Sequence, residues 1–267
     1  MKAYVTKLIE DYVNAYEKTS ETKWGTPLVG FADAAHPRLS EFREVADKNH
    51  VMPREVLEDA TVVVCYFLPF TPETARSNIT GRLSSSDWAR AYEDTNALFN
   101  ELNAHIIEQL EARGCRAAVS PEATTFDREI LMSRWSQRHM AWLAGLGTFG
   151  LNNMLITDKG CCGRFSSVVT NLEVEPGAPL TAENCLYKWE GKCGVCVKHC
   201  FSGALSTDGY DRKICFGVCS ENAAVYRGFG NSYAAGAGEA VLDTGSEVCG
   251  KCLVGVPCAF AKPVRES

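Results

Sequence analysis

The sequence predicts an α/β or α+β fold followed by a smaller module rich in cysteine. Helical patterns alternate with short β-branched runs over the first 180 residues or so, which is typical of a sheet covered by helices. From Pro179 onward the segments shorten, and nine of the 13 cysteines occur between Cys185 and Cys258. We therefore expect two domains, residues 1–178 and residues 179–267.

The expected elements of the first domain begin with an amphipathic helix over residues 1–18. Residues 61–68 have no polar alternation, as in a strand buried on both faces. A long helix is expected over residues 86–114, and a third over residues 127–144 with Asp127 as its N-terminal cap. Shorter strands are expected at residues 28–31, 115–120, 154–157 and 165–174.

The charge and hydropathy of the sequence restrict which partners the protein can bind and in which cellular compartment we expect it. The 27 Lys and Arg residues against 33 Asp and Glu give a net charge of -6, so no nucleic-acid partner is expected. The longest apolar run, residues 62–68, is too short to cross a membrane, and the N-terminus has no apolar signal segment. We expect a cytoplasmic protein without a membrane partner, in a compartment that keeps thiols reduced.

The cysteine spacing is the most specific signal in the sequence. Cys193, Cys196 and Cys200 have the C-x2-C-x3-C spacing that forms the latter part of the bacterial ferredoxin run. In two-cluster ferredoxins the ligands cross between the ends, which predicts two 4Fe-4S clusters. The expected ligands are Cys185, Cys193, Cys196 and Cys258 for one cluster, and Cys200, Cys215, Cys249 and Cys252 for the other.

Three alternatives stay open at this point. Cys219 lies about one helical turn after Cys215 and could replace it as a ligand. Paired C-x2-C units also form zinc sites, although the trailing cysteine favours iron and sulfide. A disulfide framework is disfavoured by the reducing compartment, and Cys161 and Cys162 are expected to be loop residues.

Residues 145–150 match G-x-G-x-x-G, the fingerprint of dinucleotide-binding folds. That fingerprint requires a strand before the first glycine and a helix after the last. Here the preceding residues have a helical pattern, so we do not expect a dinucleotide site.

The same stretch resembles the core of the epoxyqueuosine reductase and reductive dehalogenase-like iron-sulfur protein family. The resemblance runs over residues 136–170, through Ala-Gly-Leu-Gly at 144–147 and Arg-Phe-Ser-Ser-Val at 164–168, and continues through the cysteine block and residues 211–215. It corresponds to a short form of the family, without the tRNA-binding C-terminal domain. Leu131 stands where epoxyqueuosine reductases have a carboxylate, so reduction of epoxyqueuosine itself is not expected.

The resemblance implies a nitroreductase-like α/β domain that holds cobalamin, followed by a ferredoxin-like domain whose two clusters deliver single electrons. By this analogy the cobalamin contacts are Gly145, Gly147, Gly150, Asn152 and Asn153, although asparagines are also common in turns for backbone reasons.

Two side chains before the glycine turn are candidates for catalysis. His139 could donate a proton or contact the cofactor, or it could be an ordinary helix histidine. Arg138 could bind a corrin carboxamide or a substrate anion, or it could be an exposed helix arginine.

The expected function is an iron-sulfur reductase of a small substrate, with the clusters feeding electrons to cobalamin. The alternative is an electron carrier or a reductive activator of a corrinoid protein, with clusters and no cobalamin of its own. The expected partner is accordingly a small substrate or a redox protein, and a homodimer is possible because nitroreductase-like folds often pair.

Overall fold

The computed structural model describes residues 1–231 and 245–264. Their α-helices are α1 (Lys2–Tyr16), α2 (Phe42–Val45), α3 (Pro53–Val56), α4 (Pro72–Ser77), α5 (Ser86–Glu111), α6 (Gln137–Leu143), α7 (Leu186–Glu190), α8 (Val195–His199) and α9 (Arg212–Val225). Short 3-10 helices are η1 (Pro37–Glu41), η2 (Pro121–Ala123) and η3 (Arg227–Phe229). The strands are β1 (Leu28–Asp33), β2 (Val62–Pro69), β3 (Ala117–Ala118), β4 (Gly147–Phe149), β5 (Leu155–Thr157) and β6 (Gly163–Thr170).

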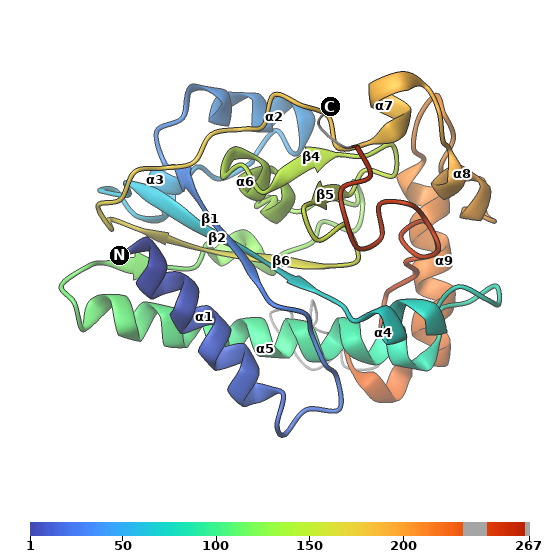
Figure 1. The fold of residues 1–267 in the computed structure, drawn as a ribbon, viewed down its shortest axis with the longest axis horizontal. Helices are drawn as coiled ribbons and strands as arrows, with labels where there is room; N and C mark the ends of the chain where they lie inside the picture. Colours follow the sequence, from blue (N-terminus) through green and yellow to red (C-terminus); the bar gives the residue numbers. More distant parts are fainter. Residues whose placement is uncertain (232–244, 265–267) are drawn as a thin grey trace.

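A four-stranded sheet with the order β1-β2-β6-β3 forms the centre of the molecule. All its strand pairs are antiparallel, so the α+β form of the prediction is the correct one. In Figure 1, α1 and α5 cover one face of this sheet, while α2, α6 and the β4-β5 hairpin lie on the other. The helices α7, α8 and α9 gather at one end of the sheet, at the right of Figure 1.

The strand β2 is buried along its whole length, as its unbroken apolar sequence predicts. Val64 and Tyr66 belong to the core cluster that contains α1 and α5. Cys65 and Phe67 belong to the cluster on the opposite face, which contains α6. Because successive side chains of a strand point to opposite faces, this one strand fills both cores.

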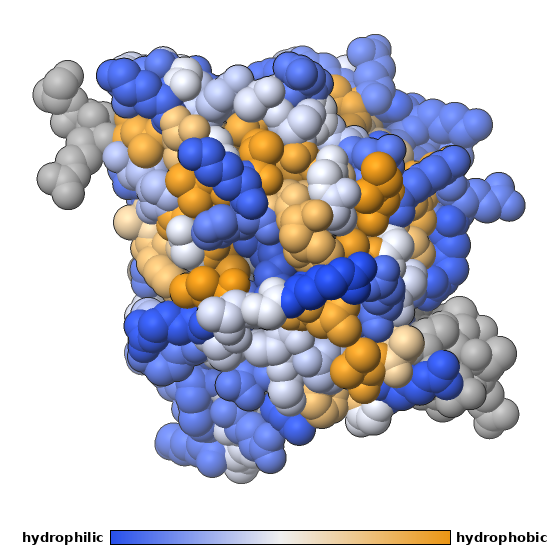
Figure 2. Space-filling model, turned by 90° about the vertical axis from the view of Figure 1, so that its right-hand side faces the viewer, coloured by the Kyte–Doolittle hydropathy of each residue, from blue (hydrophilic) through white to orange (hydrophobic). Residues whose placement is uncertain are grey.

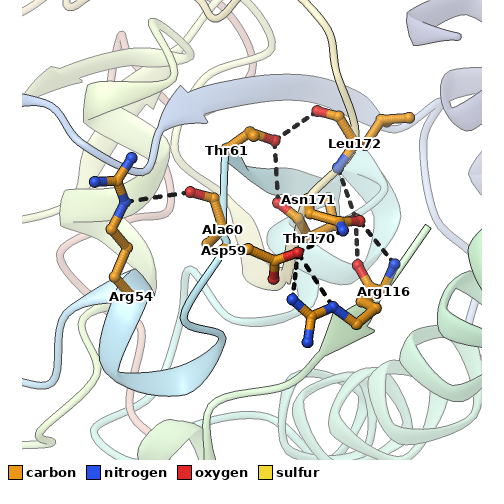
Figure 3. Close-up of polar contacts among 8 residues, drawn as sticks. All are labelled: Arg54, Asp59, Ala60, Thr61, Arg116, Thr170, Asn171 and Leu172. Atoms are coloured by element: carbon orange, nitrogen blue, oxygen red, sulfur yellow. Dashed lines mark hydrogen bonds and ion pairs between the residues drawn. The ribbon is translucent and has the colours of Figure 1, made fainter.

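Polar side chains close the end of the sheet where β2 begins and β6 ends (Figure 3). Asp59 forms an ion pair with Arg116 and also accepts a hydrogen bond of 2.7 Å from Asn171 Nδ2. The Asn171 side chain in turn accepts from the Arg116 amide at 2.7 Å, and Thr61 Oγ1 donates to the Leu172 carbonyl at 2.7 Å. These contacts connect the loop that precedes β2 with two other places, the start of β3 and the end of β6.

The helix predicted over residues 127–144 is wrong in its first half, because α6 begins only at Gln137. Asp127 does accept hydrogen bonds from the amides of Glu129 and Ile130, at 2.9 and 3.1 Å. The chain then turns back at Leu131, which has a left-handed φ of 57°, and the amide of Asp127 binds the Met132 carbonyl at 2.8 Å. The aspartate therefore caps an isolated turn, which competes with a helix for the same amides.

The other predicted elements are present, with shifted ends. The expected long helix is α5, whose cap is Ser85, and the strand expected at 115–120 shrinks to the two residues of β3. Within residues 1–231 and 245–264, no helix combines the length and the apolar character that a membrane crossing requires.

The predicted boundary between residues 178 and 179 stays a prediction. One buried apolar cluster contains α5 residues together with Cys196, Leu205 and Val254 from the cysteine-rich part. The two parts therefore share a continuous core, and the ferredoxin-like arrangement of the second part also stays a prediction.

We expect Leu102→Ala to lower the free energy of unfolding by about 2 to 5 kcal/mol, because its fully buried side chain packs in the core beneath the sheet. Glu111→Ala, at the exposed end of the same helix, should change it by less than about 0.5 kcal/mol. Urea unfolding of both variants measures the difference, and equal effects would contradict the packing described above.

Candidate metal centre

Four of the predicted ligands line one pocket, although they come from separate segments. Cys185 caps the start of α7, Cys193 precedes α8, Cys196 lies in α8, and Cys258 comes from near the C-terminus. Burial, together with the charges of Cys258, Cys185 and Cys193, raises the pKa of Cys196 to about 11. Cys193 is the exposed member of this group. The structure thus brings together the set predicted for one cluster.

The β4-β5 hairpin positions the first of these cysteines through Asn184. The amide of Asn184 donates to Thr148 Oγ1 at 2.8 Å, and its side chain donates to the Ile156 carbonyl at 2.7 Å. Ile156 also lines the pocket. The hairpin therefore fixes the residue immediately before Cys185.

Residues 245–264, which we call the C-terminal segment, return to the turn between β5 and β6. The amide of Cys161 donates to the Cys258 carbonyl at 2.9 Å, and the amide of Cys162 donates to the Ala259 carbonyl at 3.1 Å. The Sγ atoms of Cys161 and Cys258 lie 3.9 Å apart. Cys161 and Cys162 are turn residues, as expected, but the sequence did not indicate that they hold a predicted ligand in place.

The second predicted group of thiols also lies together. Burial raises the pKa of Cys252, and the charges of Cys249, Cys215 and Cys200 add to this effect. Cys200 Sγ accepts a hydrogen bond of 3.3 Å from the amide of Leu205, the kind of contact that stabilises a thiolate.

Cys219 contacts Cys215 within this group. A hydrogen bond with Cys219 lowers the pKa of Cys215 to about 6, and Tyr210 contributes in the same direction. The same contact raises the pKa of Cys219. The two thiols lie one turn apart on α9, so the choice between them as a ligand stays open.

A buried lysine, which the sequence analysis missed, lies between two of the predicted ligands. Lys251 is 5% exposed, and its Nζ donates to the carbonyls of Asn78 and Thr80, both at 2.8 Å. The side chain of Asn78 donates to the Cys249 carbonyl at 2.9 Å. Burial lowers the pKa of Lys251. The only sequence signal was a cation inside the Cys-Gly-Lys-Cys unit.

All 13 cysteines are free thiols. Within the described residues, no three His, Cys, Asp or Glu side chains form a group that could hold a metal ion. The first four thiols instead surround a pocket with apolar walls, formed by Leu151, Ile156, Leu186, Val256, Pro257 and Pro263 among others. Such walls exclude water from a bound group and influence its reduction potential.

The glycines predicted to approach cobalamin lie against the chain itself. A Cβ atom on Gly145 would come within 2.5 Å of the Ala178 carbonyl oxygen, and one on Gly147 within 2.3 Å of the Ile156 carbonyl oxygen. A Cβ on Gly150 would meet the Asn152 side chain at 2.8 Å. The run forms part of an antiparallel hairpin, which confirms that it is no dinucleotide fingerprint. Binding of cobalamin at these glycines remains a prediction.

The two asparagines after the glycines have different surroundings. Asn152 lines the thiol pocket, and its side chain donates to the Cys252 carbonyl at 3.1 Å. Asn153 has a left-handed φ of 58°, and its carbonyl accepts a hydrogen bond of 2.5 Å from Arg138 Nη1. Arg138 thus holds the turn of the hairpin, and its charge also acts on Tyr210 beside the second thiol group.

His139 is half-buried beneath aromatic rings. Its ring lies 5.1 Å from Phe42 and 4.7 Å from Phe149, and its Nδ1 is 2.7 Å from Ser136 Oγ. Burial lowers its pKa to about 4, so the imidazole is neutral at pH 7. His50, which the sequence analysis left without a role, is buried nearby, and its Nε2 accepts from the Ser136 amide at 2.9 Å.

The loop over residues 124–136 is attached to α9, the helix that carries Cys215. Arg128 forms two hydrogen bonds with Glu247, at 2.7 and 3.0 Å, and the Glu247 side chain is only 8% exposed. The rings of Phe126 and Phe216 lie 5.6 Å apart. The loop before α6 is therefore joined to the C-terminal segment through Glu247 and to α9 through Phe216.

No protein-family model matches the chain, and no curated protein matches it. Solved structures do. The epoxyqueuosine reductase of Bacillus subtilis is 17% identical over 96% of this chain and 67% of its own, with a TM-score of 0.56. The enzyme of Streptococcus thermophilus is 16% identical over 97% and 69%, with a TM-score of 0.53. An epoxyqueuosine reductase solved with a tRNA stem loop is 17% identical over 96% and 72%, with a TM-score of 0.50.

The comparisons define the class of fold. The chain has the fold of the epoxyqueuosine reductases, which confirms the resemblance at that level, and it spans about two thirds of the length of these proteins.

Removing the arginine of the loop contact leaves a nearly buried carboxylate without its cation. We expect Arg128→Ala to lower the free energy of unfolding by about 1 to 3 kcal/mol and to speed amide exchange in residues 124–136. Hydrogen exchange read by mass spectrometry measures this. Arg54→Ala, elsewhere on the domain, is the control. Unchanged exchange in the loop would show that Arg128 does not hold it.

The buried histidines predict a loss of stability in acid. A histidine whose pKa is lowered to about 4 in the folded state contributes stability above pH 6.5, and this is lost as the pH falls toward 4, because the unfolded chain binds the proton first. We expect His139→Gln to reduce the slope of unfolding free energy against pH by up to about 1.4 kcal/mol per unit in this range. Denaturant titrations of both proteins test it, and identical slopes would contradict a neutral, buried His139.

Proposed function

We propose that this chain is an iron-sulfur reductase with two 4Fe-4S clusters. Cys185, Cys193, Cys196 and Cys258 would bind one cluster, and Cys200, Cys215, Cys249 and Cys252 the other, with Cys219 as the alternative to Cys215. The resemblance adds a cobalamin in the α/β domain, which would supply the chemistry for reducing a small substrate.

The observation that carries the proposal is the convergence of four thiols, spread over residues 185–258, on one apolar pocket. Thiolates are the ligands of such clusters, and buried apolar surroundings suit a group that must be kept from water. The fold shared with epoxyqueuosine reductases supports a reductase in particular.

The clusters would supply one-electron transfer. The chain's own residues would position the thiolates and offset their negative charge. Lys251 places a positive charge near Cys249, which offsets the negative charge of a bound thiolate. The backbone amide of Leu205 donates to Cys200, and Asn152 holds the C-terminal segment against the first pocket. These contacts fix the thiols before any metal binds.

For the cobalamin, support comes from the resemblance alone, because the glycines expected to approach it contact the chain itself. We therefore assign no step to it. Arg138 and His139 remain our candidates beside the substrate. A neutral His139 can accept a proton from a substrate. Its N–H group can donate a hydrogen bond, but it cannot transfer a proton as an imidazolium would.

In the Bacillus subtilis structure, a catalytic loop that bears an aspartate is swung out of the active site. We propose residues 124–136 as the corresponding loop of this chain, in which Leu131 stands at the expected position of the carboxylate and Asp127 is the acid that would have to replace it. The Asp127 side chain is half-buried and caps the turn described above, so it would have to release two amides to act on a substrate.

We propose a small molecule as the substrate and no nucleic acid, although one solved neighbour was crystallised with a tRNA stem loop. The net charge of -6 argues against a phosphate-binding surface in this chain. The second candidate function is an electron carrier or activator of a separate corrinoid protein, which the closely packed glycines favour.

Anaerobic purification from cells supplied with cobalamin tests the proposal. We expect about eight irons and eight sulfides per chain, and about half of each in Cys258→Ala. Cys65→Ala, a buried thiol outside both groups, should keep all of them. Bound cobalt would support the reductase and its absence the carrier. A colourless protein, or one that contains zinc, would overturn both.

A further inference from the structure

The outer surface of α7 and α8 is unlike the rest of the molecule. Cys193, the exposed member of the first thiol group, lies between these two short helices. Trp189 on α7 is 58% exposed, and Lys188, Lys192 and Lys198 are exposed around it. We call these five residues the α7-α8 face.

The side of the molecule that carries this face is shown in Figure 2, where apolar patches are separated by hydrophilic side chains. An apolar centre with a charged rim is the usual composition of a protein-binding surface. Within residues 1–231 and 245–264, nothing covers more than part of this indole, so most of it is left without a packing role in the chain.

The charge of the face differs from that of the body. Residues 1–180 contain 18 Lys and Arg against 24 Asp and Glu, a net charge of -6, whereas residues 181–267 contain nine of each. Within α7, α8 and the residues between them there are three lysines and one acid, Glu190, which pairs with Lys192 at 3.0 Å. An acidic partner would be repelled by most of this protein and attracted here.

We propose that the α7-α8 face is the docking site of an acidic one-electron carrier protein that exchanges electrons with the cluster bound near Cys193. This inference depends on the proposed function. One electron leaves the reduced carrier, which is oxidised, and enters the cluster, which is reduced. No bond forms or breaks. A small face with charged steering suits such a partner, because redox complexes are weak and small.

The experiment uses cluster-loaded full-length protein and a plant-type 2Fe-2S ferredoxin as the acidic carrier. The protein is reduced with dithionite, freed of excess reductant and mixed with oxidised ferredoxin in a stopped-flow spectrometer. We expect the triple variant Lys188→Glu, Lys192→Glu and Lys198→Glu to lower the second-order rate constant about tenfold at low salt, with the difference shrinking as salt is added. Trp189→Ala should lower the rate constant at every salt concentration.

A matched triple variant, Lys2→Glu, Lys18→Glu and Lys48→Glu, changes the net charge equally on other exposed surfaces. It should lower the rate constant less than about threefold. Equal effects of the two triple variants, or no effect of either, would overturn the docking site. So would a dimer in solution that Trp189→Ala dissociates, since a second copy would then occupy the face.

Two controls separate this proposal from the one on which it depends. Methyl viologen, a small electron acceptor, should oxidise all variants at the same rate, which shows that their clusters are intact. Failure of the wild-type protein to contain iron, or to bleach with dithionite, would overturn the proposed function itself.

Discussion

The return of the C-terminal segment to the turn between β5 and β6 is the contact on which the rest of the site depends. Three predicted ligands lie in this segment, and none has a helix or strand of its own to hold it. Backbone hydrogen bonds to Cys161 and Cys162 place Cys258, while Asn78 and Lys251 place Cys249. Since Cys161, Cys162 and Asn78 belong to the α+β body, the C-terminal segment and its three cysteines are held against that body.

Gathering so many thiols has an electrostatic consequence. Burial and mutual repulsion raise the pKa of Cys196, Cys249 and Cys252, so these side chains are neutral thiols when no cation is bound. A bound cationic group would reverse this, because each ligand must lose its proton. Binding would therefore release protons, and the buried ammonium of Lys251 would then face negative sulfurs instead of neutral ones.

The sequence predicted what is local and missed what is not. The unbroken apolar run of β2 and the stripes of α1 and α5 were sufficient for the sheet and the helices on one face, because burial alone dictates them. The ferredoxin spacing predicted two groups of thiols, and that assignment of ligands stays a prediction. The first half of the helix over 127–144 failed because a side-chain cap fits an isolated turn as well as a helix, and the left-handed Leu131 has no sequence signature. The roles of Cys161, Asn78 and Lys251 depend on contacts between segments about 100 residues or more apart, which no local pattern contains.

The helix α9 connects the second thiol group to the loop before α6. This helix carries Cys215 and Cys219 toward the second thiol group and Phe216 toward the loop over residues 124–136. Tyr210, just before it, contacts Cys215 and is influenced by the charge of Arg138. Tyr210 therefore connects the second thiol group to the side chains around α6. If the proposed reduction takes place near Arg138 and His139, the loop over residues 124–136 would connect that place to the helix that carries two of the candidate ligands.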